Sequence, residues 1–327
     1  MKKIIPIDHG NRFCKTLHHI FPSSYMESSY LPSIGGDILQ YNGKTYTLVD
    51  QCLPVINDKT EDQRYFILSL FAVGKELMKE IDMLQRRACV PQDPMEIELL
   101  IGLPLQHYEV YREKFRQYFT DRIGTIQFEL NDWPYAIRFT GAHVFPQAYA
   151  AAITAYDRLI DSRIVNVIDV GGFTVDCLQL NNFNPNMALC TSLYWGTNTL
   201  CQSINDQVRG TGAREIANDV IERIISREPD ALYEYSSKRI DMVTSATVSH
   251  VNRMLSEIAQ KGFDLHEDKT VFMGGGSILL KEYILSTGKV KKPIFIDDIY
   301  ANAKGYRLIY DMQNGNSVTQ AIRRNDE

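Results

Sequence analysis

One local pattern occurs twice in this chain, and it constrains the fold more than any other feature. In each copy an apolar strand ends in an aspartate, a glycine follows two residues later, and a polar turn leads into a second strand. The first copy is IIPIDHGNRFCK, Ile4 to Lys15, and the second is VIDVGGFTVD, Val167 to Asp176. The second half of the chain therefore begins as the first half does, which predicts two domains that start alike.

Both turns suit a phosphate group. Glycine lets the backbone approach a phosphate and point N–H groups at it, and Lys15 adds positive charge beside the first turn. Asp8 and Asp169, one at each strand end, are suited to hold Mg²⁺ through its water shell, since magnesium gives up water reluctantly. Either turn alone could be an ordinary hairpin turn, because Asp and Gly are common there. The pair, together with a third glycine cluster at Gly274, favours a polyphosphate site.

Length and composition set broad limits. The 327 residues suggest about two domains, and the content of 44% hydrophobic and 23% charged residues is ordinary for a globular protein. The net charge of −5 argues against broad electrostatic binding of nucleic acid or anionic membrane. No apolar stretch approaches the roughly 18 residues that span a bilayer, and the basic start lacks a long enough apolar run for a signal peptide, so we expect a cytoplasmic protein. The six cysteines form no CxxC pair or zinc-finger spacing: Cys14, Cys52, Cys89, Cys177, Cys190 and Cys201.

Hydrophobic periodicity predicts alternating strands and helices. Ile38–Val49 is typical of a hairpin, because Asn42-Gly43 is the favoured type I′ turn pair. Thr60 to Ile81 is predicted as a helix that opens with a capping box at Thr60 and Gln63. The other predicted helices are His107–Phe119, Gln147–Asp161 (alanine-rich, opened by Pro146), Thr197–Val208, Ala213–Arg227, Lys238–Lys261 and Ile299–Tyr310. The other predicted strands are Glu96–Gly102, Thr125–Asn131, Tyr135–Thr140, Ile164–Val170, Phe173–Leu180, Met187–Tyr194, Thr270–Met273 and Pro293–Ile296.

Five segments, in order, resemble the actin-like ATPase superfamily, and most closely the bacterial plasmid-segregation actins of the ParM or StbA type. They are the two turns, FPQAYAAA around Gln147, VFMGGGS with its glycines, and ANAKG from Ala301 to Gly305. A weaker similarity lies in AREIANDVIERI around Glu222. The resemblance implies an α/β fold in which two RNase H-like domains flank a nucleotide cleft. It places domain I at residues 1–160 plus 297–327 and domain II at residues 161–296.

The resemblance also implies roles for individual residues. Gln147, Asp169 and Asp8 would be catalytic, with Gln147 orienting the water that attacks the γ-phosphate, and Asp8 and Asp169 would hold Mg²⁺. The nucleotide-binding residues would be Gly10, Asn11, Arg12, Lys15, Gly171, Gly172, Phe173, Thr174, Asp176, Glu222, Gly274, Gly275, Gly276 and Ser277. Two positions depart from the pattern. Asn11 and Arg12 stand where actin has small residues, so Arg12 either contacts phosphate or points to solvent. Proteins of the ParM type often have glutamate where Gln147 stands. The amide of Gln147 can still position the water, because it accepts and donates hydrogen bonds, but it does not serve as a strict general base.

The implied function is an ATPase that binds Mg-ATP (GTP remains open), polymerises into filaments and drives plasmid DNA segregation. Its partners would be further copies of itself and a DNA-bound adaptor of the ParR type, with no direct contact to nucleic acid or membrane. The chain has no GxxxxGK[ST] loop, which argues against a Walker-type ATPase. Two alternatives stay open: another actin-like cytoskeletal or scaffold protein, and a small-metabolite kinase of the same fold.

Overall fold

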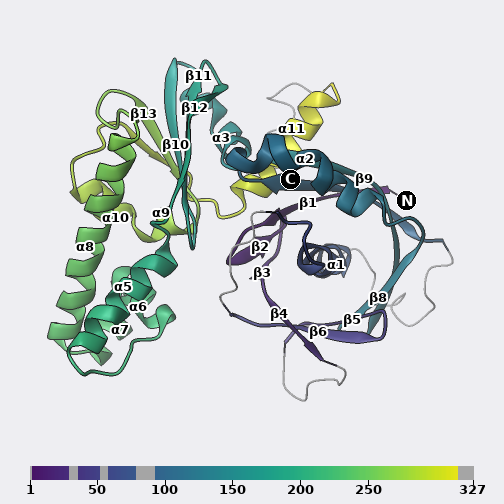
Figure 1. Ribbon diagram of the computed structural model, residues 1–327, viewed down its shortest axis with the longest axis horizontal. Coiled ribbons are helices and arrows are strands. Elements are labelled where there is room, and N and C mark those ends of the chain that lie inside the picture. The colour runs from purple at the N-terminus through teal and green to yellow at the C-terminus, as the bar shows by residue number, and fades with distance from the viewer. Residues whose placement is uncertain (1, 29–35, 52–57, 79–92, 316–327) are drawn as a thin grey trace. The chain divides into compact units, whose positions relative to one another are not determined.

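The computed structural model describes residues 2–28, 36–51, 58–78 and 93–315. Cys52, Cys89 and the predicted helix beyond Met78 lie outside them. The chain divides into two compact units, unit 1 (Met1–Thr154 and Asn302–Glu327) and unit 2 (Ala155–Ala301). Each unit combines one sheet with helices (Figure 1), which confirms the predicted α/β class. No helix among the described residues is long and apolar enough to cross a membrane.

Unit 1 is built on a sheet that has nine strands within the described residues, in the order β3-β2-β1-β7-β9-β8-β5-β6-β4. β1 and β9 lie on either side of β7 and both run parallel to it, while the other pairings are antiparallel. The strands are β1 (Lys2–His9), β2 (Phe13–Lys15), β3 (Ile20–Pro22), β4 (Tyr25–Ser28), β5 (Ile38–Tyr41), β6 (Lys44–Leu48), β7 (Met95–Leu103), β8 (Ile126–Leu130) and β9 (Trp133–Pro146).

The unit 1 sheet curves around helix α1 (Arg64–Met78), which is buried along most of its length (Figure 1). Apolar side chains all round a helix are typical of one that is enclosed by protein. Helix α2 (Leu105–Thr120) adds Phe115 and Phe119 to the same core. Helices α3 (Tyr149–Ile153) and α11 (Ala301–Gln313) pack together, and Tyr306 of α11 stacks on Phe145 of β9.

Unit 2 lies wholly within the described range 93–315, and its sheet has the order β12-β11-β10-β13-β14. Its strands are β10 (Ile164–Val170), β11 (Val175–Asn181), β12 (Asn184–Leu193), β13 (Lys269–Met273) and β14 (Pro293–Phe295). Its helices are α4 (Tyr156–Leu159), α5 (Thr197–Gly210), α6 (Asn218–Ile225), α7 (Pro229–Glu234), α8 (Ser237–Gln260), α9 (Gly275–Leu279) and α10 (Lys281–Ser286). β10 and β13 are parallel neighbours, so Asp169 and Met273 end up side by side.

The predicted hairpin is confirmed as β5 and β6, with positive φ at both Asn42 and Gly43 as a type I′ turn requires. The predicted capping box is wrong. Helix α1 begins at Arg64, whose N–H is accepted by Asp62 at 2.7 Å. The hydroxyl of Thr60 instead donates to Asp58 at 2.6 Å, in the turn before the helix.

The single alanine-rich helix predicted from Gln147 to Asp161 is also wrong. Pro146 ends strand β9, and two short helices, α3 and α4, follow in place of one. Ala148 has φ 60°, which an α-helix does not accept. Other boundaries shift in unit 2: β11 begins at Val175 rather than Phe173, β12 at Asn184 rather than Met187, and α6 at Asn218 rather than Ala213.

Candidate functional site

The first turn is a tight connection between β1 and β2. Asp8 pairs with Lys15 across the hairpin. A side chain on Gly10 would meet the carbonyl oxygen of Phe13 at 2.6 Å, so the turn closes only around a glycine. The guanidinium of Arg12 lies 5.1 Å from the centre of the Phe13 ring, which gives it a cation–π contact within its own turn. Asn11 is partly buried beside it.

The carboxylate of Asp8 is buried and held by three side chains. Its Oδ1 accepts a hydrogen bond from Gln147 Nε2 at 2.7 Å, and its Oδ2 accepts one from Asn302 Nδ2 at 3.5 Å. Lys15 Nζ lies 3.8 Å from Oδ2. The other end of the Asn302 amide accepts the N–H of Ala148 at 3.0 Å. Asp8, Gln147 and Lys15, all selected from sequence, are therefore brought together, and Asn302 joins them.

Gln147 sits in a strained turn rather than in a helix. The N–H of Tyr149 donates to the carbonyl of Gln147 at 2.7 Å, across Ala148 with φ 60° and ψ −48°. This is a γ-turn with positive φ, a rare and strained form. The N–H of Gln147 donates to Leu103 O at the end of β7 at 2.8 Å. The end of β7, the γ-turn and Asn302 therefore fix where the Gln147 amide points.

The second turn joins β10 to β11. Asp169 pairs with Asp176, and the N–H of Gly171 donates to Thr174 O at 2.9 Å. The carboxylate of Asp176 accepts hydrogen bonds from the hydroxyls of Thr174 and Ser192. Asp176 is thus engaged by neighbouring hydroxyls on its own sheet.

The start of α5 supports this second turn from behind. The N–H groups of Gly196, Thr197 and Asn198 donate to the carbonyls of Phe173, Gly171 and Gly172 at 3.1, 3.1 and 2.7 Å. A side chain on Gly196 would meet Gly172 O at 2.4 Å. Because these donors are backbone groups, the turn carbonyls are fixed by main chain rather than by side chains.

The glycine run after β13 is the start of a helix rather than a loose loop. Gly274 has φ 83°, and a side chain there would meet Asp169 Oδ1 at 2.2 Å and Val170 O at 2.6 Å. Gly276 packs as closely against Val170, whereas a Cβ on Gly275 would meet no atom within 4 Å. Ser277 is buried, and its hydroxyl donates to Gly274 O at 2.9 Å.

Gly274 and Gly276 therefore pack closely against the end of β10, where the second turn begins. Glu222 lies on α6, a different element of unit 2, where it is partly buried.

Three further residues lie at the first turn or contact it, and none of them was selected from the sequence. Asn302 lies in a segment selected only for its small residues. His9 and Lys59 are buried beside the turn, and Lys59 Nζ donates to the carbonyl of His9 at 2.8 Å. The sequence gives little signal for Lys59, because the polar run Asp58 to Arg64 has the composition of an exposed loop.

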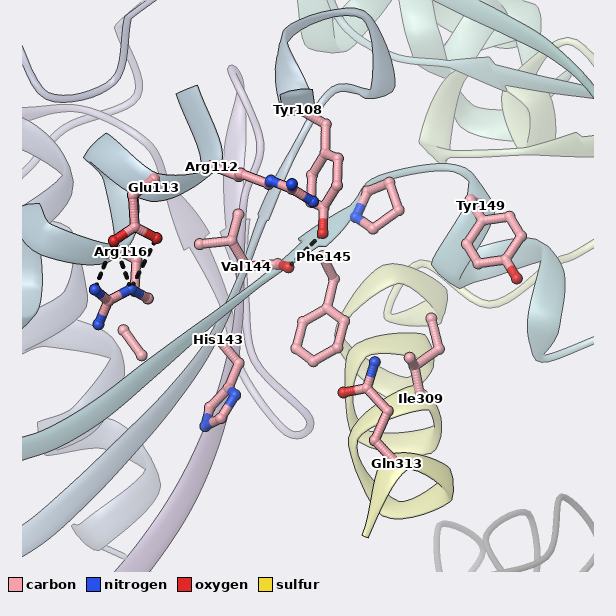
Figure 2. A pocket seen from close by; sticks show the side chains of 12 residues that line it. Tyr108, Arg112, Glu113, Arg116, His143, Val144, Phe145, Tyr149, Ile309 and Gln313 are labelled. Carbon is pink, nitrogen blue, oxygen red and sulfur yellow. Dashed lines mark hydrogen bonds and ion pairs between the residues drawn. The ribbon is translucent and has the colours of Figure 1, made fainter. Parts of the chain in front are cut away.

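A cavity of about 430 Å³ lies on unit 1 among β9, α2 and α11, and none of the predicted site residues lines it (Figure 2). Pro146 and Tyr149, which flank Gln147, line it. Several of its polar side chains have partners: Tyr108 donates to Val144 O at 3.3 Å, and Arg116 is paired with Glu113 at 2.6 Å. We therefore place the chemistry at the turns and not in this cavity.

Two family models match the chain, one in each half. The model of the N-terminal domain of actin-like proteins matches residues 7–149. The model of the C-terminal part of the archaeal actin homologue MreB-like matches residues 167–285. Together the two matches span most of the chain and include both turns. A comparison with the curated proteins finds no match.

Solved structures give the same result. The archaeal actin homologue Ta0583 has a TM-score of 0.73 at 17% identity, over 95% of this chain and 99% of that one. Its complex with ADP has a TM-score of 0.70 at 16% identity, over 94% and 99%. A ParM from Clostridium botulinum, solved as a 15-stranded filament, has a TM-score of 0.68 at 18% identity, over 96% and 100%. At these identities the likeness establishes the actin-like fold.

Proposed function

Because the chain belongs to the actin-like proteins, we propose that it binds ATP with magnesium, hydrolyses it, and forms filaments that segregate plasmid DNA. The observation that carries the proposal is the 2.7 Å hydrogen bond between Asp8, at the end of β1, and Gln147. It joins a strand-end carboxylate to an amide able to orient water, beside a glycine turn and Lys15. The ADP complex of the archaeal homologue supports nucleotide binding. We assign units 1 and 2 as the two actin-like domains.

The first turn and Gln147 have distinct tasks in this proposal. Lys15 neutralises phosphate charge, and the backbone beyond Gly10 approaches a phosphate oxygen. Gln147 aligns the attacking water, since its amide both donates and accepts hydrogen bonds. Asn11 and Arg12 lie at the same turn, and we assign Arg12 a contact with a phosphate. Phosphoryl transfer depends mainly on positioning and electrostatics, which is what these residues supply.

The second turn and α9 take the rest of the nucleotide. The N–H of Gly171 closes the turn on Thr174, so we assign phosphate contacts to the following N–H groups, those of Gly172 and Phe173. Thr174 and Asp176 fix the shape of that turn. The open side of Gly275 leaves room for a nucleoside, beside Gly274, Gly276 and Ser277, and Glu222 is assigned to the ribose hydroxyls.

The carboxylates of the two strand ends are ligands of the type that magnesium prefers. Mg²⁺ keeps several waters and is usually held by one or two carboxylates together with substrate phosphates. Asp8 and Asp169 each offer a carboxylate at a strand end, and the hydrogen bonds to Asp8 come from groups that water could replace. When bound, the ion would neutralise charge on the phosphates. Asp8 and Asp169 would hold the ion through its water shell.

Filament formation is supported by the likeness to a ParM solved as a filament. We propose that this chain assembles with ATP, and that an adaptor of the ParR type links the filament to plasmid DNA, so that the chain itself does not contact DNA. Electron microscopy and light scattering with ATP and with GTP test assembly and nucleotide choice together. Absence of assembly with either nucleotide over a wide protein range would remove the filament from the proposal.

Hydrolysis is tested with Gln147→Ala and Asp169→Ala. Matched controls are Gln117→Ala, which removes an exposed glutamine paired with Glu113, and Asp206→Ala, which removes an exposed carboxylate paired with Arg209. We expect Gln147→Ala to bind ATP normally and to lose about 10²-fold or more in turnover. Asp169→Ala should weaken ATP binding and lower turnover. Unchanged turnover in both variants, or a wild-type protein without nucleotide-dependent turnover, would overturn the assignment.

A further inference from the structure

Lys59 is a lysine in the interior of unit 1. It lies in the turn before α1, and only 5% of its surface is exposed. Its Nζ donates to the carbonyl of His9 at 2.8 Å and to the carbonyl of Gly102 at 3.3 Å. Lysine is almost never buried to this degree without specific partners, so the position of these two carbonyls matters.

The two carbonyls belong to the ends of neighbouring parallel strands. β1 and β7 pair residue by residue up to Ile7 and Ile101, where their ladder ends. Gly102 follows Ile101 directly, and His9 lies two residues beyond Ile7, so both are within the last two residues of their strands. One side-chain nitrogen that binds both carbonyls therefore continues the connection between the strands beyond their last pair.

These strand ends carry the groups of the proposed reaction. Asp8 precedes His9, and Leu103, which follows Gly102, accepts the N–H of Gln147 at 2.8 Å. A side chain on Gly102 would meet Gln147 Cγ at 3.0 Å, so Gln147 packs directly on this strand end. Lys59 is thus bonded one residue away from Asp8 and one residue away from the anchor of Gln147.

The surroundings of Lys59 are aromatic. Its Nζ lies 5.2 Å from the centre of the Tyr65 ring and 5.9 Å from that of Phe115. The ring of His9 packs against the same two rings. Burial, and then the charge of Lys59, lower the pKa of His9 well below its usual value.

The tautomer of His9 can also be assigned. The hydroxyl of Ser69 donates to Tyr65 O at 2.8 Å, so Nε2–H of His9 donates to Ser69 Oγ, at 2.8 Å. The lowered pKa favours the neutral ring, and the positive charge beside it is that of Lys59.

We propose that Lys59 is a positioning residue that holds Asp8 and Gln147 in register for hydrolysis, an inference that rests on the proposed function. Ordinary packing does not account for the arrangement, because an apolar side chain of similar length would fill the aromatic pocket without a desolvated charge. Hydrogen bonds from a charged donor to two carbonyls fix geometry more tightly than apolar contact does. The catalytic pair is sensitive to such geometry, since a 1 Å misplacement can cost about 10²-fold in rate.

The test uses Lys59→Met, Lys59→Gln and Lys59→Arg. The control is Lys44→Met, which removes an exposed lysine of β6 that is paired with the exposed Glu27 at 2.6 Å. We expect Lys59→Met to lower kcat about 10-fold or more, with KM for ATP changed less than about 3-fold. Lys59→Arg, which keeps a charged donor, should recover most of the loss, and Lys44→Met should behave as wild type. If Lys59→Met does not fold, Lys59→Gln, which keeps an N–H donor, takes its place.

Hydrogen–deuterium exchange supplies a readout that needs no activity. Peptides covering the ends of β1 and β7 should exchange about 10-fold faster in Lys59→Met, and their exchange should be unchanged in Lys44→Met. A wild-type protein without turnover would defeat the proposed function, and exchange alone would then decide the role of Lys59. Unchanged exchange, a normal kcat with only a lower melting temperature, or a raised KM at normal kcat would each overturn the inference.

Discussion

Gly274→Ala is the sharpest single test of the geometry in unit 2. Gly274 has φ 83° and ψ 159°, a region of backbone space that only glycine occupies readily. Forcing another residue into such a conformation costs about 1–3 kcal/mol. The new Cβ would also lie 2.2 Å from Asp169 Oδ1 and 2.6 Å from Val170 O. The Asp169 side chain can move aside, but the Val170 carbonyl is backbone of β10, so overpacking adds about 1–3 kcal/mol.

The neighbouring residue provides the control for stability. A Cβ on Gly275 meets no atom within 4 Å, and Gly275 is the first residue of α9. Alanine is favoured over glycine in a helix by about 0.5–1 kcal/mol. Gly275→Ala should therefore be neutral or slightly stabilising, while Gly274→Ala, one residue earlier, should lower the free energy of unfolding of unit 2 by about 2–6 kcal/mol.

Urea denaturation measures this difference. The chain has two tryptophans, Trp133 in unit 1 and Trp195 in unit 2, so a Trp133→Phe background leaves a reporter of unit 2. Trp195 is well placed for this, because its indole N–H donates to Glu257 at 2.6 Å in the folded unit. With a slope of about 2 kcal/mol per molar urea, the middle of the usual range, the midpoint of Gly274→Ala should fall by about 1–3 M. Equal midpoints for Gly274→Ala, Gly275→Ala and the parent would refute the reasoning.

Two further predictions concern unit 1. Gly305→Ala should destabilise it by about 3 kcal/mol, read from Trp133 in urea, because the new Cβ would meet Ala150 O at 2.0 Å. A midpoint equal to that of the parent would contradict this packing. Burial raises the pKa of Glu98, but hydrogen bonds from three neighbours outweigh it and hold the pKa below its usual 4.5: Lys2, His143 and Tyr310. Glu98 therefore contributes stability that is full above its unfolded pKa and is lost as pH falls through its lower folded pKa. Unfolding measured between about pH 5 and 3 should show a shallower acid loss in Glu98→Gln, and identical slopes would count against the cluster.

Local sequence signals predict an element correctly where all the residues that determine it lie within one segment. The Asn42-Gly43 hairpin is such a case, because the two residues that need positive φ are adjacent. The strands that carry Asp8 and Asp169 were also found, since buried parallel strands read as short apolar runs. The signals misled where a distant contact decides the outcome. Gln147 to Asp161 has the composition of a helix, but Ala148 is held in a γ-turn by Asn302, which lies 154 residues away.

The residues of the candidate site also fall into those that the sequence indicates and those that only the fold reveals. Sequence selected Asp8, Lys15 and Gln147, and the fold brings them into contact although Gln147 lies 139 residues from Asp8. Asn302 lies 294 residues from Asp8, and nothing in its own segment indicates a role in the turn. The sequence does not single out Lys59, because its neighbours in the chain are also polar. These residues act through contacts that no local pattern encodes, so they emerge only from the fold.

The two turns differ in what supports them, and this difference determines how each responds to substitution. The carboxylate of the first turn is held by side chains, those of Gln147, Asn302 and Lys15. The carbonyls of the second turn are held by backbone N–H groups at the start of α5, and close contact with Gly274 completes it. A side chain can be shortened while the surrounding backbone stays in place, whereas a glycine in close contact cannot be enlarged without moving main chain. Substitutions around the first turn should therefore separate catalysis from folding, and those behind the second turn should impair both together.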